Sequence, residues 1–364
     1  MRVVTIVCWL VAAAVLTGLA IWFLTGTVFG FGSGGWTGLR GISNLSFNIG
    51  GWENLSGPFE VAGEYTASAS GVSSIKIDWI ASTVDVEPYD GNDIKITEFA
   101  QRKLSDAERL YVSMSGDTLT IRFRERSFSG NMPQKKLEVL IPRQLCGNLN
   151  MFEVDSTSGG INVEGVSAVA FKTDAISGAV NITNVKAGSF HVSTTSGSLT
   201  VKSVQAEDMK LEGITGSVHV SGSSAGKINC DTTSGRINIE GAYNSVKLNS
   251  ISGNMTLDDT AQGADVIAET TSGTIELTGS FNEVKTNNIS GSATVKSSII
   301  PSSLKADSTS GRVSVYVPNE GTISVNHSST SGRFSSDVPV TMQNKGAQFS
   351  FSTISGTTKI YVLD

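Results

Sequence analysis

From about residue 151 onward, one pattern of apolar and polar positions returns at a nearly constant period of about 19 residues. Each copy surrounds a Ser-Gly or Thr-Gly pair. The residues two and four places after the glycine are apolar, as in Ile161 and Val163, and the residue between them is polar, as in Asn162. This period-two alternation predicts a short β-strand with one side in a core and the other in water.

Apolar residues also stand seven places before each glycine, as in Phe152 and Phe171, and mostly five places before it. Each repeat is therefore predicted to hold two strands joined at a corner, where glycine takes backbone angles that strain other residues. The structural corners predicted in this way are Gly159, Gly178, Gly197, Gly216, Gly235, Gly253, Gly273, Gly291 and Gly311. The phrase continues at Gly332 and Gly356, and we expect the repeats to stack in sequence order.

One such repeat cannot bury its apolar side alone, but stacked copies make a continuous core. The sequence therefore predicts an all-β fold, a β-solenoid. The residue two places before the glycine alternates between Thr and Ile over nine repeats, and four lysines, six places before the glycine, occur only in the Ile repeats. If Thr repeats stack on Thr repeats and Ile repeats on Ile repeats, one coil holds two repeats and has about 38 residues. The alternative is a coil of one repeat, about 19 residues. We favour the longer coil, which would place Lys172, Lys210, Lys247 and Lys285 about 4.8 Å apart as a cationic stripe.

Residues 3–24 contain no charge and, as a helix, would be about 33 Å long, enough to cross a bilayer. Their length favours an uncleaved transmembrane anchor over a signal peptide. Arg2 precedes the segment and the next basic residue is Arg40, which predicts a single-pass protein with a cytoplasmic amino terminus and most of the chain outside the cell membrane.

The chain is expected to divide into four parts: an anchor over residues 1–25, a Gly-rich juxtamembrane spacer over 26–63, an irregular β cap over 64–150 and solenoid repeats over 151–364. Within the cap, residues 75–86 match the repeat register, with Ser82 in place of the glycine. They are predicted to form a first, degenerate coil, because the end units of a solenoid differ from the others.

Charged residues make up only 16% of the chain and the formal net charge is −6. The sequence has no basic patch mixed with aromatic residues, so nucleic acid is not an expected partner. Three cysteines, Cys8, Cys146 and Cys230, give no disulfide framework. Cys230 falls at an inward position and is expected to be a small buried residue.

Candidate chemistry is sparse. The outward position four places before the glycine is mainly acidic, but each acid has a Lys or polar neighbour, as expected for a solvated face. The histidines His191, His219 and His327 occupy different register positions and show no metal-ligand spacing. We predict no catalytic residue, no metal and no cofactor. A polysaccharide-acting enzyme stays an alternative if Asp231 and Arg236 converge in a groove.

The order of residues 75–86, a hairpin ending in Leu119-Thr120-Ile121, a strand closing on Ile141-Pro142 and alternating Thr-Ser-Gly and Ile-Ser-Gly units resembles a bacterial family of unknown function, called "putative adhesin". The resemblance covers about residues 70–364 and implies a β-strand repeat architecture without catalytic residues. Some relatives are similar to components of envelope-stress systems.

We therefore predict a membrane-anchored, extracytoplasmic, non-enzymatic binding or adhesive module. The lysine stripe is its candidate ligand-binding site, and an anionic envelope polymer or lipid headgroup is the ligand that such a stripe would attract. The alternative is an accessory of an envelope-stress sensor, with a membrane protein as its partner.

Overall fold

The structure is a computed structural model that describes residues 57–125, 132–343 and 345–363. The described residues all belong to one compact unit. The transmembrane helix expected over residues 3–24 lies outside them. In the part of the chain that the structure describes, no helix is long and apolar enough to cross a membrane. The described unit is all-β, as predicted, with two helical segments of three and four residues.

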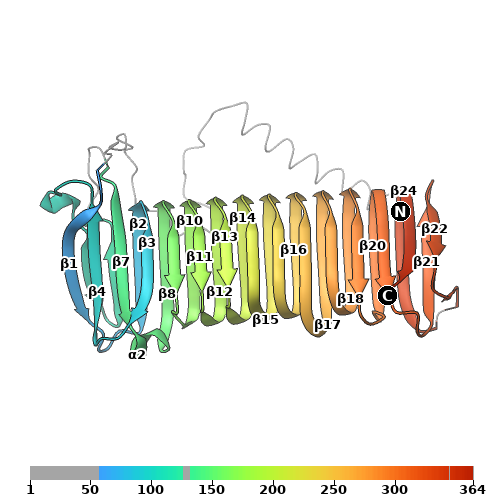
Figure 1. The fold of residues 1–364 in the computed structure, drawn as a ribbon, viewed down its shortest axis with the longest axis horizontal. Helices are drawn as coiled ribbons and strands as arrows, with labels where there is room; N and C mark the ends of the chain where they lie inside the picture. Colours follow the sequence, from blue (N-terminus) through green and yellow to red (C-terminus); the bar gives the residue numbers. More distant parts are fainter. Residues whose placement is uncertain (1–56, 126–131, 344, 364) are drawn as a thin grey trace. The chain divides into compact units, whose positions relative to one another are not determined.

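The first turn of the stack consists of β2 (Ser74–Ala81) and β3 (Val84–Tyr89), which meet at Ser82. Strands β2 and β3 pair in parallel with β8 and β9 of the next turn, so the predicted degenerate coil is confirmed. The other elements of this end are β1 (Glu60–Ser68), β4 (Asp93–Ala100), η1 (Asp106–Glu108), β5 (Tyr111–Ser115), β6 (Thr118–Arg122), β7 (Lys135–Pro142) and α2 (Arg143–Cys146). Antiparallel pairs β1–β4, β4–β7 and β5–β6 distinguish this end from the stack (Figure 1).

The repeats follow as parallel strands, one turn after another (Figure 1). The early turns consist of a long strand before the corner and a short one after it: β8 (Leu149–Ser158), β9 (Ile161–Glu164), β10 (Ala168–Ser177), β11 (Val180–Thr183), β12 (Lys186–Ser196) and β13 (Leu199–Lys202). In the later turns most strands run from one corner to the next: β14 (Gln205–Thr215), β15 (Val218–Ser234), β16 (Ile237–Ser252), β17 (Met255–Ser272), β18 (Ile275–Ser290), β19 (Ala293–Ser297) and β20 (Ser303–Val317).

The register of these parallel strands decides the length of the coil. Phe171 pairs with Phe152 on one side and with Phe190 on the other, and this offset of a single repeat recurs in the next turns. The longer coil, which would hold two repeats, is therefore wrong, and each turn of the stack holds one repeat. In these turns each repeat lies next to the repeat that follows it in the sequence, so the Thr and Ile repeats alternate along the stack as they do along the chain.

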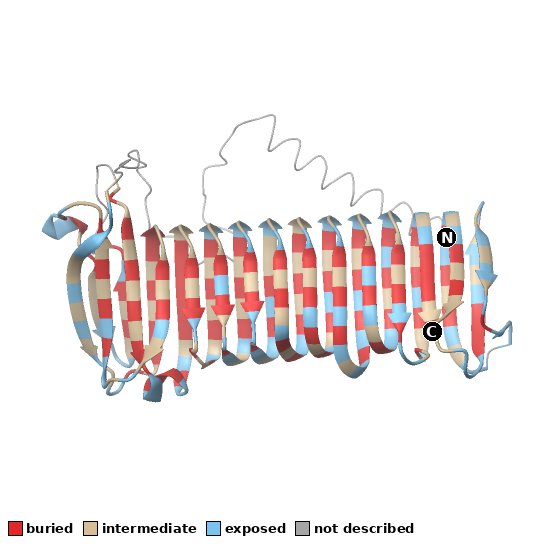
Figure 2. Cartoon of the chain, in the orientation of Figure 1, coloured by how far each residue is buried: buried red, intermediate tan, exposed pale blue. Residues whose placement is uncertain are grey.

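The inward positions are the predicted ones. The apolar residues at minus seven, plus two and plus four are all at most 3% exposed in the repeats from Gly159 to Gly311. The alternation of buried and exposed bands along each strand is visible in Figure 2. Phe152, Phe171 and Phe190 stack with ring centroids 5.3 and 5.0 Å apart. Cys230 is fully buried, as expected, and burial raises the pKa of its thiol.

The corner glycines are required for two reasons. Most have φ between 115° and 149°, a region that L side chains rarely adopt. In addition, a Cβ on Gly235 would lie well inside 3.0 Å of the carbonyl oxygen of Gly216 in the preceding turn, and the same holds along the whole column. The turns therefore touch through their backbones at the corner.

The carboxyl-terminal end departs from the expected stacking in sequence order. Its strands are β21 (Ile323–Ser329), β22 (Arg333–Ser336), β23 (Val340–Thr341) and β24 (Ala347–Val362). Strand β24 pairs with β20 over its whole length, and β21 and β22 pair with the other side of β24. The last repeat, at Gly356, thus lies between the repeats at Gly311 and Gly332. Both repeats carry the corner phrase, so local sequence does not decide which of them pairs with β20.

Candidate functional site

The candidate ligand-binding lysines lie on the outer face of the strands that precede the corner glycines. The strands before each corner place residues at positions minus six and minus four on this face, because side chains alternate between core and solvent. Parallel pairing turns each position into a column. In stack order, the minus-six column reads Lys76, Glu153, Lys172, His191, Lys210, Asn229, Lys247, Ile267, Lys285 and Lys305.

The four predicted lysines share one column, but they are not neighbours in it. His191, Asn229 and Ile267 separate them, so successive lysines lie about 9.6 Å apart, twice the expected spacing. The continuous stripe was wrong because it depended on the longer coil. Lys285 has a cationic neighbour that the stripe did not include, Lys305 in the adjacent turn.

The first turns of this face form an ion-pair network. Lys76 lies 3.0 Å from Glu153 and 3.5 Å from Asp155, and Lys172 lies 3.0 Å from Glu153 and 2.6 Å from Asp174. Burial opposes the shift, but hydrogen bonds from the two lysines hold the pKa of Glu153 below its usual range. Lys172 is therefore neutralised within its own surface.

Asp155 has the most perturbed carboxyl of this network. It is 8% exposed, and its Oδ1 atom has no hydrogen-bond partner among the described residues. Burial raises the pKa of Asp155 to about 6, the neighbouring charge of Glu153 adds to this shift, and Lys76 and Lys172 oppose it. Part of the Asp155 population therefore takes up a proton at mildly acidic pH.

Further along the stack the pairing continues with one exception. Lys210 lies 2.9 Å from Glu212, which also contacts the His191 ring at 2.7 Å, and Lys285 lies 2.8 Å from Glu269. Lys247 makes no ion pair with any residue that the structure describes. Within the described part of the chain, Lys247 is therefore the one of the four predicted lysines without an ion-pair partner.

Lys247 also lines a shallow hollow on this face. The hollow lies between the minus-four column and the exposed minus-two column, and its other lining residues include Asn249, Ile251, Glu269, Thr271 and Ile289. Amide, carboxylate, ammonium and branched apolar groups thus meet at one place. The arrangement can hold a ligand by contact and hydrogen bonds.

Asp231 and Arg236, the residues on which the enzyme alternative depends, do not come together in a groove. Asp231 accepts a hydrogen bond from Asn249 at 2.6 Å, whereas Arg236 is exposed on the other side of the corner glycine. Within the described residues the two side chains make no ion pair. Nor do these residues include a group of three or more His, Cys, Asp or Glu side chains that could hold a metal ion.

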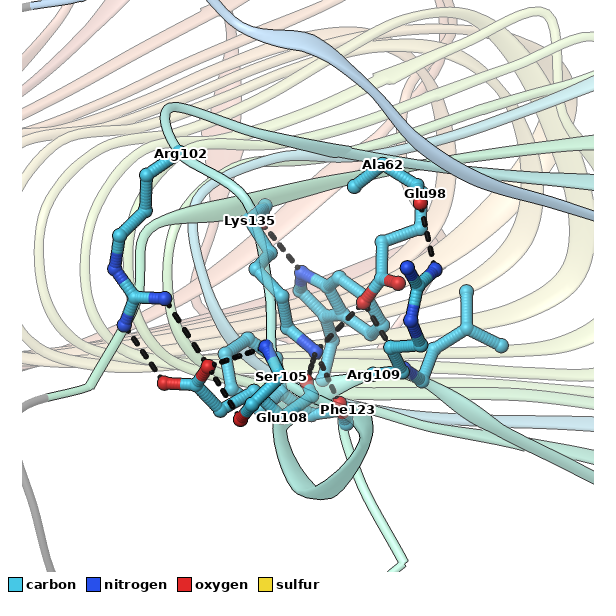
Figure 3. A network of polar contacts seen from close by, with 10 residues as sticks. Ala62, Glu98, Arg102, Ser105, Glu108, Arg109, Phe123 and Lys135 are labelled. Carbon is cyan, nitrogen blue, oxygen red and sulfur yellow. Dashed lines mark hydrogen bonds and ion pairs between the residues drawn. The ribbon is translucent and has the colours of Figure 1, made fainter.

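A second polar cluster, which the sequence analysis missed, lies in the irregular end (Figure 3). The ammonium of Lys135 is fully buried and donates to Glu98 Oε1 at 2.8 Å, to the carbonyl of Glu108 at 2.6 Å and to the carbonyl of Phe123. It also lies 3.8 Å from the centroid of the Phe123 ring. Burial lowers the pKa of Lys135 to about 8, against the charge of Glu98.

This cluster joins β4, η1, β7 and Phe123, the residue that follows β6, so we interpret it as a set of contacts that stabilises the irregular end. Arg102 and Ser105 extend it by donating to the Glu108 carboxylate, and the Arg102 bonds hold the pKa of Glu108 at about 2 (Figure 3). A signal existed in the sequence: Lys135 stands in phase with Leu137 and Val139 at the inward positions of its strand.

Comparison with known proteins decides the family. The family model called Toastrack DUF4097 matches residues 72–278 and 239–360, which together cover most of the chain. The chain belongs to the Toastrack DUF4097 family. The described part of this Toastrack chain has the all-β repeat fold that the resemblance implied. No curated protein matches it.

Several solved structures are similar to this Toastrack chain. A putative adhesin from Parabacteroides distasonis is 11% identical, with a TM-score of 0.39, over 84% of this chain and 98% of its own. A putative lipid binding protein from the same species is 14% identical, with a TM-score of 0.37, over 82% and 96%. A putative adhesin from Parabacteroides merdae is also 14% identical, with a TM-score of 0.35, over 82% and 95%.

Proposed function

We propose that this Toastrack protein is a membrane-anchored β-solenoid that acts outside the cell as a non-enzymatic binding module. Its ligand-binding face is the minus-six column with Lys172, Lys210, Lys247 and Lys285, which we call the lysine column. The observation that carries the proposal is Lys247, a cation that makes no ion pair among the described residues and lies beside a hollow lined by amide, carboxylate and apolar side chains. The carboxylates nearest to the other three lysines are held in ion pairs, which favours contact over catalysis.

The ligand of this face carries anionic groups, either on an envelope polymer or on lipid headgroups. An ammonium about every second turn suits a ligand whose charges repeat about every 9.6 Å. Ion pairs within the face can exchange partners, because exposed pairs contribute only about 0 to 1 kcal/mol each. A polyvalent ligand gains from several weak contacts at once.

Substitution of the column tests this proposal. The full chain with Lys172, Lys210, Lys247 and Lys285 all changed to Gln is compared with a chain in which Lys186, Lys202, Lys227 and Lys296 are changed to Gln. The second set is exposed, lies at other register positions and has the same total charge. We expect retention on an anionic glycopolymer or on anionic lipid vesicles to fall about tenfold or more for the first set only.

The two supports distinguish the two sources of the anion. Loss of retention on vesicles alone indicates lipid headgroups, and loss on the soluble polymer alone indicates an envelope polymer. Equal retention by the two substituted chains contradicts the proposal. If a membrane protein co-purifies equally with both chains, the face is not the binding surface and the stress-sensor alternative gains support.

Anchoring is tested separately. Deletion of residues 3–24 is expected to release the chain from the membrane fraction, because no other segment of the sequence is as long and apolar. Protease added to intact cells is expected to digest the repeats of the full chain. Protection of the repeats in intact cells contradicts the proposed topology.

A further inference from the structure

The position two places before each corner glycine forms an exposed ridge of alternating large and small side chains. We call it the Ile/Thr ridge. In stack order its residues are Thr157, Ile176, Thr195, Ile214, Thr233, Ile251, Thr271, Ile289, Thr309, Ile354 and Thr330. The five isoleucines are 37 to 51% exposed, although isoleucine is among the residues most often buried.

The alternation belongs to the stack and not to the sequence. Along the chain the last members appear as Thr309, Thr330 and Ile354, so two threonines follow each other. Insertion of β24 between β20 and β21 places Ile354 between the two threonines. The folded ridge therefore keeps strict alternation to its end.

Each threonine is a gap between two isoleucines. The hollow described above shows one such gap directly: Ile251 and Ile289 form its walls and Thr271 lies between them. Parallel strands lie about 4.8 Å apart, so large side chains and gaps each recur about every 9.6 Å. A surface that fills several gaps must present an apolar side chain with this same period.

We propose that the Ile/Thr ridge is a self-association surface, occupied by the same ridge of a second copy of this chain. The two stacks run antiparallel, with each isoleucine opposite a threonine. Read from one end, the ten positions from Thr157 to Ile354 begin with Thr, and read from the other they begin with Ile. An antiparallel overlap of these ten turns, which leaves Thr330 outside the contact, thus pairs Thr157 with Ile354 and Thr233 with Ile251, whereas overlap of all eleven turns would set Thr against Thr and Ile against Ile. A two-fold axis along the stack would instead set Ile against Ile and leave the gaps empty.

The size and charge of the surface agree with this occupant. Ten turns extend about 48 Å, so the roughly 800 Å² per partner that specific interfaces need requires a contact about 17 Å wide, which has to include the columns beside the ridge. In the antiparallel arrangement the minus-four columns of the two copies lie on the same side. Carboxylates that come close there, such as Asp174, Glu212 and Asp307, already pair with lysines of their own chain. The flanks therefore do not repel each other strongly.

Sedimentation of the full chain in one mild detergent measures the association. Ile214→Glu and Ile251→Glu are expected to weaken the dimer about tenfold or more, since each puts a charge into an apolar contact. Val169→Glu and Met342→Glu are the controls, because these apolar residues are more exposed but lie outside the ridge. Circular dichroism and the unfolding midpoint establish that each variant folds.

Thr271→Trp distinguishes a shape-complementary contact from nonspecific hydrophobic association. It enlarges the apolar surface but fills a gap, so we expect weaker association. Stronger association, or a wild-type chain that stays monomeric at its highest soluble concentration, overturns the proposal.

Disulfide formation tests the orientation. In a Cys8→Ser background, whose remaining cysteines Cys146 and Cys230 are buried, Thr195→Cys is mixed with Ile289→Cys, its partner in the ten-turn overlap. A mixture with Ile354→Cys tests the register shifted by two turns. We expect covalent dimers in one mixture and not in either variant alone, since a disulfide needs Cα atoms about 4.4 to 6.8 Å apart. Disulfides within a single variant, or in no mixture, overturn the antiparallel arrangement. The hollow beside Lys247 belongs both to the ridge and to the proposed ligand-binding face, so a second copy and a ligand would compete for it. Both association tests are carried out without ligand, so their outcome does not depend on ligand binding by the lysine column.

Discussion

The regular turns and the irregular end hold their neighbouring strands together in different ways. In the turns from β8 to β20, neighbouring repeats touch backbone to backbone at the corner glycines, and apolar columns fill the inside. In the irregular end, β6 and β7 still pair in parallel with β2 and β3, but β1, β4 and β5 form antiparallel pairs in place of further repeats, and a buried ion pair between Lys135 and Glu98 joins the elements. Repetition supplies specificity in the first region, whereas single directional contacts supply it in the second.

The largest expected effect is at a corner. Gly235→Ala is expected to destabilise the protein by about 4 kcal/mol or more, because its Cβ would overlap the carbonyl of Gly216 in the adjacent turn. Gly263→Ala is the matched control: Gly263 also has positive φ, but no atom lies within 4 Å of its added Cβ, so we expect about 1 to 2 kcal/mol. Denaturant unfolding measures both. If both variants lose the same free energy of unfolding, the corners require glycine because of its backbone angles and not because of contact between turns.

Next comes the buried pair of the irregular end. Lys135→Met leaves the Glu98 carboxylate buried without its ammonium and is expected to cost about 3 to 5 kcal/mol. The double variant Lys135→Met/Glu98→Leu is expected to recover much of this loss, since no unpaired charge remains. Thermal unfolding followed by circular dichroism measures the difference. A double variant no more stable than Lys135→Met would mean that the hydrogen bonds to the backbone carbonyls, and not the charge, fasten this end.

A smaller effect of opposite sign is expected where the two regions meet. The pKa of Asp155 is raised to about 6, so the folded state binds its proton more tightly than the unfolded state. The stability that this group contributes is present below about pH 4 and is lost as pH rises through about 6. Asp155→Asn should therefore stabilise the protein at pH 7 by about 2 to 3 kcal/mol. The gain should vanish at pH 4. A gain of the same size at both pH values would contradict the assignment.

The smallest effect is expected on the outer face of the regular turns. Lys210→Gln removes a half-exposed ion pair with Glu212 and should change the free energy of unfolding by less than about 1 kcal/mol. The unfolding midpoint measured at low and high salt checks this. A loss as large as that of Lys135→Met would mean that the lysine column is structural, and its role in binding would need another explanation.

Much of this architecture could be predicted from residues alone. The alternation around Ile161 and Val163 gave the inward positions, and the substitution of Ser82 for glycine still allowed the first coil to be found. Both succeed because side-chain direction in a strand depends on local backbone geometry. For the same reason the sequence predicts correctly that the four lysines share one register position. The predicted distance between them is wrong, because it depends on which repeats are neighbours.

The failures concern contacts between residues far apart in the chain. The difference between Thr and Ile repeats favours the longer coil at the level of sequence. In the structure Thr repeats lie next to Ile repeats, which produces the Ile/Thr ridge. Pairing of Lys135 with Glu98 could not be read from spacing, since the two residues come from different strands of an irregular sheet.

The sequence by itself determined what each residue does within its own strand: which side chains face the core, where the chain turns, and why glycine stands at the corner. Only the tertiary structure decided which repeat lies beside which, including the insertion of the last repeat between the two before it. The physical reason is that parallel pairing is satisfied equally by any strand with the same alternation. Order along the stack therefore depends on packing between turns, to which every repeat contributes at once.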